Sequence, residues 1–262
     1  MENSILEVED LSVSFKEKKV LENVSFRVQQ GRIYSVIGKN GCGKTTLLRT
    51  ICRSRKPDGG RVLLQGQDIF RLSSKSVART MAILSQSNDT MSDVTVEVLT
   101  GYGRYAHRKW YARSGSSDKE IIEWAMERTG VQDLRDRKIN TLSGGERQRA
   151  WLSMLLAQKP EVMLLDEPTT YLDIAHQLEI MDLVADLNRT EGITILMVLH
   201  DINHAARYSD ELIILDDHRV FRQGPPWELI REGALGQVFG VETDILENTD
   251  GEPIFFAKRV MK

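Results

Sequence analysis

The first part of the chain alternates apolar and polar residues in two stretches. Residues 5–15 and 20–28 show this alternation, and the four charged residues 16–19, Lys-Glu-Lys-Lys, separate them. A period of two is typical of strands that bury one face, so the pattern predicts two antiparallel strands. We therefore expect a small β-sheet at the start of the chain.

Short apolar runs predict further strands. They lie at residues 34–37, 81–84, 162–165 and 193–199. The last two are nearly continuous, as in parallel strands that are covered on both faces. Residues 61–65 follow a Pro-Asp-Gly-Gly turn and also suit a strand, and residues 211–223 suit a hairpin.

Helical periodicity occupies other stretches. It predicts helices at residues 46–53 and 172–188, and it dominates residues 94–159. One apolar face of that last stretch comprises Ile121, Ile122, Trp124, Ala125 and Val131. Strands that alternate with helices predict an α/β fold, and the long helical stretch predicts an insertion into it.

Composition narrows the classes of protein. The chain has 262 residues, of which 41% are hydrophobic, and this allows a sizeable core. Its formal net charge of −3 disfavours nucleic acid as a partner. The longest apolar run is strand-sized, so no membrane-spanning helix is expected. The acidic N-terminus does not resemble a secretory signal, which favours the cytosol, where Cys42 and Cys52 are expected as reduced thiols.

A glycine-rich motif carries the strongest chemical signal. Residues 38–45 fit G-x-x-x-x-G-K-[ST] and follow the apolar run at 34–37. In such a loop, backbone N–H groups and a helix N-terminus surround phosphate, the lysine contacts the β- and γ-phosphates, and the threonine binds Mg²⁺. The expected nucleotide contacts are Gly38, Lys39, Asn40, Gly41, Cys42, Gly43, Lys44, Thr45 and Thr46.

Cys42 of this loop has an expected reactivity of its own. It precedes the helix and lies beside Lys44. Positive charge and a helix N-terminus both favour a thiolate. We therefore expect a reactive thiol at this position.

Two carboxylates follow the apolar run at 162–165. Asp166 and Glu167 come directly after it, and ligands of open α/β sheets bind where strands end. Asp166 suits the coordination of Mg²⁺, and Glu167 suits the polarisation of an attacking water.

A third motif predicts a second phosphate contact. Ser143 is a good helix N-cap, and Gly144 and Gly145 allow close approach of a ligand to the backbone. The run Leu-Ser-Gly-Gly-Glu at residues 142–146, together with the two motifs above, resembles the signature of the ABC ATPase family. The resemblance implies ATP and Mg²⁺ as cofactors. It also implies a head-to-tail dimer with a second copy, in which the signature of one copy completes the ATP site of the other.

The resemblance assigns roles to four more positions. Gln86 matches the glutamine that connects the ATP site, with its Mg²⁺, to the helical subdomain, and His200 matches the switch histidine that contacts the γ-phosphate. Asp173 matches the loop that links the two sites across the dimer. Phe15 falls where many relatives stack an aromatic ring on adenine, and a core position in its strand is an equally good interpretation.

The resemblance also implies the architecture. It predicts a P-loop NTPase core with a mixed sheet, an N-terminal antiparallel β-subdomain and a helical subdomain inserted at about residues 88–160. The nucleotide-binding domain would span residues 1–229, and residues 230–262 would form a C-terminal extension.

The resemblance fits three classes of ABC ATPase: a transport motor, a chromosome or repair ATPase, and a tandem translation factor. The chain has a single phosphate loop, and the interval between Thr46 and Leu142 lacks a long coiled coil. A transport motor is therefore expected, with a non-transport ABC ATPase as the weaker alternative.

Residues 95–105, 166–177 and 198–208 most resemble the ATPase subunits of bacterial ferric-siderophore importers, with vitamin B12 importers close by. This implies membrane permease subunits as partners, an extracytoplasmic substrate-binding protein, and a peripheral place on the cytoplasmic face of the inner membrane. Residues 88–108 would accept the coupling helix of the permease.

Overall fold

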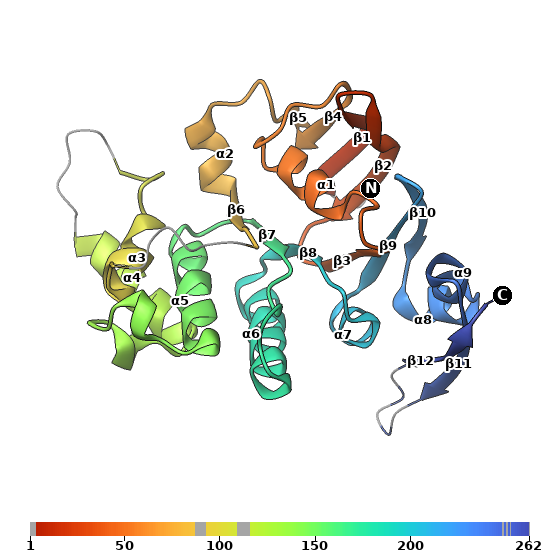
Figure 1. Cartoon of the computed structure of the whole chain (residues 1–262). Helices are drawn as coiled ribbons and strands as arrows, with labels where there is room; N and C mark the ends of the chain where they lie inside the picture. Colours follow the sequence, from red (N-terminus) through yellow and green to blue (C-terminus); the bar gives the residue numbers. More distant parts are fainter. Residues whose placement is uncertain are drawn as a thin grey trace. The chain divides into compact units, whose positions relative to one another are not determined.

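We describe a computed structural model of the chain, in which residues 4–86, 93–108, 116–247, 249, 251 and 253–261 are described. Its backbone divides into two compact units. The first unit comprises Met1–Leu72 and Thr194–Lys262, and the second comprises Ser73–Ile193. Figure 1 colours both units along the sequence.

The first unit begins with an antiparallel sheet in the order β2-β1-β4-β5. These strands are β1 (Ser4–Phe15), β2 (Lys18–Gln29), β4 (Gly59–Leu64) and β5 (Gln67–Asp68). Val8 of β1 pairs with Phe26 of β2, and the alternating side chains of one face are buried. The antiparallel pair expected from the alternation is therefore confirmed.

A mixed group of strands forms the core of the first unit. Strands β9 (Glu211–Asp216), β3 (Ile33–Gly38) and β8 (Thr194–Val198) are parallel, and β10 (Arg219–Gly224) is antiparallel to β9. Every residue of β3 is buried. Helices α1 (Lys44–Ile51) and α7 (Ile202–Tyr208) follow β3 and β8 in the chain, so the expected mixed sheet is confirmed.

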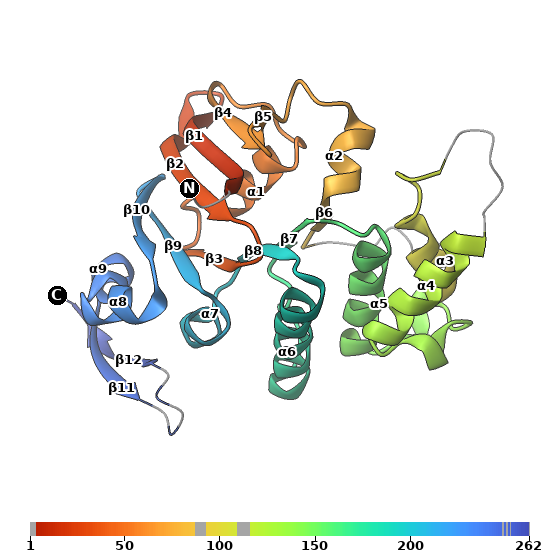
Figure 2. The same ribbon diagram turned by 180° about the vertical axis from the view of Figure 1, so that it is seen from behind.

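The end of the chain adds elements that the sequence pattern did not predict. They are α8 (Pro226–Arg231), α9 (Ala234–Phe239) and a hairpin of β11 (Val241–Glu247) and β12 (Pro253–Val260). Both views show α8 and α9 beside this hairpin (Figure 1, Figure 2). The side chain of Asn203 on α7 bonds the backbone N–H and C=O of Phe255, which ties the hairpin to α7.

The second unit contains the parallel pair β6 (Met81–Leu84) and β7 (Val162–Asp166) together with most of the long helices. Every residue of β7 is buried, as expected for a strand covered on both faces. The helices are α2 (Ser74–Thr80), α3 (Val96–Tyr102), α4 (Ser116–Arg128), α5 (Gly144–Ala157) and α6 (Ile174–Glu191). Short 3₁₀ turns occupy Gln132–Leu134 and Ile139–Thr141.

Helices α3, α4 and α5 occupy the stretch of helical periodicity, and they pack against one another. Within the described ranges, none of the helices is both long and apolar enough to cross a membrane.

Candidate functional site

The glycine-rich loop connects β3 to α1 in the first unit. Gly43 has a left-handed backbone with φ of +110°, and a Cβ placed there would lie 2.6 Å from the carbonyl oxygen of Val20. A Cβ at Gly38, where φ is +154°, would overlap the carbonyl oxygen of Leu215 at 2.2 Å. Glycine at both positions is therefore required by packing as well as by the turn.

Lys44 turns back into this loop. Its ammonium Nζ donates hydrogen bonds to the carbonyl oxygens of Gly38 (2.7 Å) and Lys39 (3.0 Å), and the residue is only 6% exposed. Two carbonyl dipoles thus hold a buried positive charge on the inner side of the loop, where the sequence motif expects phosphate.

The expected reactive thiolate at Cys42 is wrong. The residue is 6% exposed, and burial raises the pKa of its thiol above the ordinary value. The positive charge of Lys44 lowers that pKa, but it does not offset the loss of hydration. Cys42 is therefore a buried thiol, and Cys52 at the other end of α1 is also unpaired.

Phe15 lies at the exposed end of β1. Its side chain is among the large apolar groups that stay accessible, at 48%, so its interpretation as a core residue is wrong. The guanidinium of Arg55 lies 3.7 Å from the centre of the ring, a cation–π contact. Stacking of Phe15 on adenine stays a prediction.

In the second unit, the two carboxylates at the end of β7 differ in their surroundings. Asp166 is 4% exposed, whereas Glu167 begins the following loop with a left-handed φ of +54°. The side chain of Glu167 accepts two hydrogen bonds at Oε2, from Nε2 of Gln86 at 2.7 Å and from Oγ1 of Thr170 at 3.0 Å. The fold therefore brings together Gln86 and Glu167, which are far apart in the sequence.

Thr170 was not identified from the sequence. It is the fourth residue of the run Glu-Pro-Thr-Thr, and only the turn after Glu167 brings its hydroxyl to the carboxylate. The turn closes with a backbone hydrogen bond from Thr170 N–H to Glu167 C=O. Two donors on one oxygen fix the direction of the Glu167 carboxylate.

The signature run starts helix α5 through a capping box. The Glu146 N–H donates to the Ser143 hydroxyl oxygen at 3.3 Å, and the Ser143 N–H donates to the Glu146 carboxylate at 2.8 Å. The hydrogen bonds from Ser143 hold the pKa of Glu146 below its usual range. The prediction that Ser143 is a helix N-cap is confirmed.

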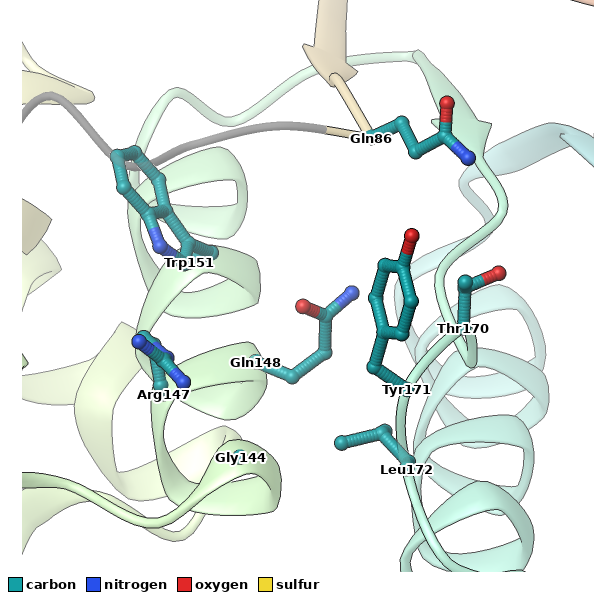
Figure 3. A pocket seen from close by; sticks show the side chains of 8 residues that line it. All are labelled: Gln86, Gly144, Arg147, Gln148, Trp151, Thr170, Tyr171 and Leu172. Carbon is teal, nitrogen blue, oxygen red and sulfur yellow. The ribbon is translucent and has the colours of Figure 1, made fainter.

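A pocket of about 160 Å³ lies where the signature helix faces the loop after Glu167. Figure 3 shows the side chain of Gln148 between the helix and that loop, and its Nε2 donates to the carbonyl oxygen of Pro168 at 2.7 Å. The lining residues are Gln86, Gly144, Arg147, Gln148, Trp151, Thr170, Tyr171 and Leu172. Gln86, the signature and the loop of Glu167 therefore belong to one local site.

Asp173 and His200 each occupy the start of a helix. Asp173 is the N-cap of α6, and hydrogen bonds from the His176 N–H and ring lower the pKa of its carboxyl. His200 lies two residues after the end of β8 and directly before Asp201, the N-cap of α7. The candidate residues thus form two groups, each within one unit.

The first unit holds Phe15, the glycine-rich loop through Thr46 and His200, and the second unit holds Gln86, Ser143, Gly144, Gly145, Asp166, Glu167 and Asp173.

Comparisons with known proteins identify the family of the chain. The family model described as ABC transporter matches residues 21–170. The chain is 44% identical to the iron(3+)-hydroxamate import ATP-binding protein FhuC of Bacillus subtilis (strain 168) over 241 residues, or 92% of this chain and 90% of the relative. It is 42% identical to the petrobactin import ATP-binding protein FpuC of Bacillus anthracis over 98% of this chain and 94% of the relative.

A third relative is the ferric enterobactin transport ATP-binding protein FepC of Escherichia coli (strain K12), which is 42% identical over 92% of this chain and 89% of the relative. Among solved structures, CbiO1 of Clostridium perfringens, part of an ABC transporter complex, is 27% identical with a TM-score of 0.79, covering 90% of this chain and 94% of that chain. An inward-facing metal-chelate type ABC transporter has a TM-score of 0.84 at 23% identity, covering 98% of each chain, which supports the fold alone. The expected family and its resemblance to siderophore-import proteins are confirmed.

Proposed function

Because the chain belongs to the ABC transporter family, we propose that it is the ATP-hydrolysing subunit of an importer for ferric siderophores or another iron chelate. The observation that carries this proposal is the identity of 42–44% to three iron-chelate import proteins over at least 92% of the chain. Such identity extends beyond the nucleotide motifs, which all ABC ATPases share.

ATP would bind at the glycine-rich loop between β3 and α1. Lys44 would exchange its bonds to the loop carbonyls for the β- and γ-phosphates, and Phe15 would stack on the adenine. Thr45, Asp166 and Gln86 would hold Mg²⁺, which would neutralise phosphate charge. Mg²⁺ is commonly bound by one or two carboxylates together with phosphate oxygens of the substrate.

Glu167 would act as the general base. Its carboxylate is oriented by Thr170 and Gln86, and a positioned carboxylate can accept a proton from the attacking water. His200 would contact the γ-phosphate, by resemblance. Gln86 would respond to bound nucleotide, because its amide group can bind either the Glu167 carboxylate or the Mg²⁺ that accompanies ATP.

The signature would act on a second copy of the chain. Ser143, Gly144 and Gly145 stand at the N-terminus of a 14-residue helix, where N–H groups and the helix dipole favour phosphate. We infer a head-to-tail dimer in which these residues and Asp173 complete the site of the partner. ATP binds the closed dimer more tightly than the open one, and this difference drives closure.

The permease would dock on the second unit. Helix α3 and the turn after it expose the apolar side chains of Val98 (45%), Tyr102 (42%) and Tyr105 (80%). This surface lies in the expected docking segment 88–108, of which residues 88–92 are outside the described residues. Contact with permease subunits, which also serve an extracytoplasmic binding protein, would hold the chain at the cytoplasmic face of the inner membrane.

The domain division remains part of this proposal. Residues 1–229 would form the nucleotide-binding domain, with a helical subdomain at about 88–160, and residues 230–262 a C-terminal extension.

Measuring uptake in cells tests which substrate is transported. Cells that lack this protein should fail to accumulate a labelled ferric siderophore under iron limitation, and the Lys44→Ala variant should not restore uptake. Capture of the chelate outside the membrane should persist, because it needs no ATP. Normal iron uptake with lost cobalamin uptake would replace the proposal by vitamin B12 import. Intact uptake of both would leave only a general ABC transport ATPase.

A further inference from the structure

The second glycine of the signature lies against a histidine ring. A Cβ placed on Gly145 would lie 2.2 Å from Cδ2, 2.9 Å from Cγ and 3.1 Å from Nε2 of His176. Real Cβ atoms do not come so close to a ring, so the ring occupies the space that a side chain at 145 would need. Glycine at this position is therefore required by a contact within the same chain.

The same ring bonds the aspartate of the cross-dimer loop. Nδ1 of His176 lies 2.8 Å from Oδ1 of Asp173, and the His176 N–H donates to the same oxygen at 2.9 Å. A carboxylate only accepts hydrogen bonds, so Nδ1 carries the proton. One side chain thus contacts both the start of α5 and the start of α6.

A neighbouring contact has the same character. A Cβ on Gly144 would lie 3.1 Å from a methyl carbon of Leu172, and Figure 3 shows the Leu172 side chain pointing toward the signature helix. Leu172 and His176 therefore close the gap between the loop after Glu167 and the first turn of α5. Side chains that pack this closely do not move independently.

We propose that His176 is a positioning residue that holds the signature glycine Gly145 and the loop aspartate Asp173 as one rigid piece. The inference rests on the proposed function, in which both residues act on the site of a second copy. If each moved separately, closure of the dimer would have to order two segments. The His176 bridge orders them in advance, which lowers the entropic cost of closure.

The test uses full-length chains that carry Glu167→Gln, in which ATP should bind while turnover is slowed about 10²- to 10⁴-fold. Adding His176→Ala should weaken ATP-dependent association of the two copies at least tenfold, because each dimer loses the bridge twice. Binding of a fluorescent ATP analogue by the monomer should not change. Glu179→Gln is the matched control, since it removes only the exposed Arg149–Glu179 ion pair between α5 and α6, and it should stay within twofold.

A second measurement isolates the ring contact. Gly145→Ala should lower the Tm by about 4 °C in the nucleotide-free chain, because its methyl group overlaps the ring, and His176→Ala should remove this penalty. His176→Phe keeps a ring against Gly145 but loses the bond to Asp173, so its association should be intermediate.

The outcomes separate the two claims. Failure of two Glu167→Gln chains to associate with each other in the presence of ATP would overturn the proposed function. Normal association of the His176→Ala form, or loss of nucleotide binding by its monomer, would overturn the positioning role alone. An undiminished Tm penalty of Gly145→Ala in the His176→Ala background would also overturn it.

Discussion

The hydroxyl of Thr170 should set the turnover rate of the enzyme. Thr170→Val keeps the shape of the side chain but removes the donor that lies 3.0 Å from Oε2 of Glu167. A hydrogen bond to a charged group contributes about 1.5–3 kcal/mol, and about 1.36 kcal/mol of barrier corresponds to a tenfold change in rate. If the full free energy of this bond served to hold Glu167 in its reactive orientation, losing the bond would slow hydrolysis by about 10- to 150-fold.

The expected value lies at the lower end of that range, because Nε2 of Gln86 still donates to the same oxygen at 2.7 Å. We expect kcat to fall about tenfold while the KM for ATP stays constant, since Thr170 bonds the base and is not among the residues proposed to hold the nucleotide.

The assay is steady-state release of phosphate from MgATP, with Thr169→Val as the control. Thr169 is the neighbouring threonine in the same turn, and among the described contacts its hydroxyl does not bond Glu167. A kcat of Thr170→Val within twofold of the unaltered protein, or an equal loss in the control, would refute the orienting role of Thr170.

Three other predictions follow from the site. Glu167→Gln keeps an acceptor oxygen for both donors but cannot take a proton, so turnover should fall by about 10²- to 10⁴-fold with ATP binding intact; a near-normal rate would eliminate it as the base. Ser143→Arg should abolish hydrolysis without impairing nucleotide binding by the monomer. Mixing this variant with the Lys44→Ala variant should restore one intact site per heterodimer. Loss of nucleotide binding by the Ser143→Arg monomer would contradict the action of Ser143 across the dimer. The raised pKa of Cys42 keeps its thiol protonated near neutrality, so maleimide should modify Cys52 first. The rate of maleimide labelling at Cys42 should increase as the pH rises through that pKa. Faster labelling of Cys42 than of Cys52 at pH 7 would contradict the burial of Cys42.

The elements that the sequence predicted best are those with a strong local signal. The run at 81–84 coincides with β6 (Met81–Leu84), because apolar residues bounded by polar ones have few alternatives. The helix expected at 172–188 begins instead at Ile174, since Asp173 serves as its N-cap. The hairpin of β11 and β12 was missed because much of its side-chain surface is exposed, which weakens any hydrophobic period.

The residues of the site show the same difference between local signals and tertiary packing. Lys44, Ser143 and Glu167 were predicted because each belongs to a contiguous motif. The bond from Thr170 to Glu167 depends on the left-handed turn at Glu167, and no spacing rule encodes it. The burial of Cys42 depends on tertiary packing, as its sulfur would lie 2.9 Å from a Cβ on Gly38.

The central claim is that ATP joins two copies of this chain through sites that neither copy completes alone. The most direct measurement is the mass of the Glu167→Gln chain in solution by light scattering, with MgATP, with MgADP and without nucleotide. The account predicts a dimer with MgATP only, which holds two ATP molecules and disappears when Ser143→Arg is added. A chain that stays monomeric at saturating MgATP, or a dimer of equal stability without nucleotide, would contradict it.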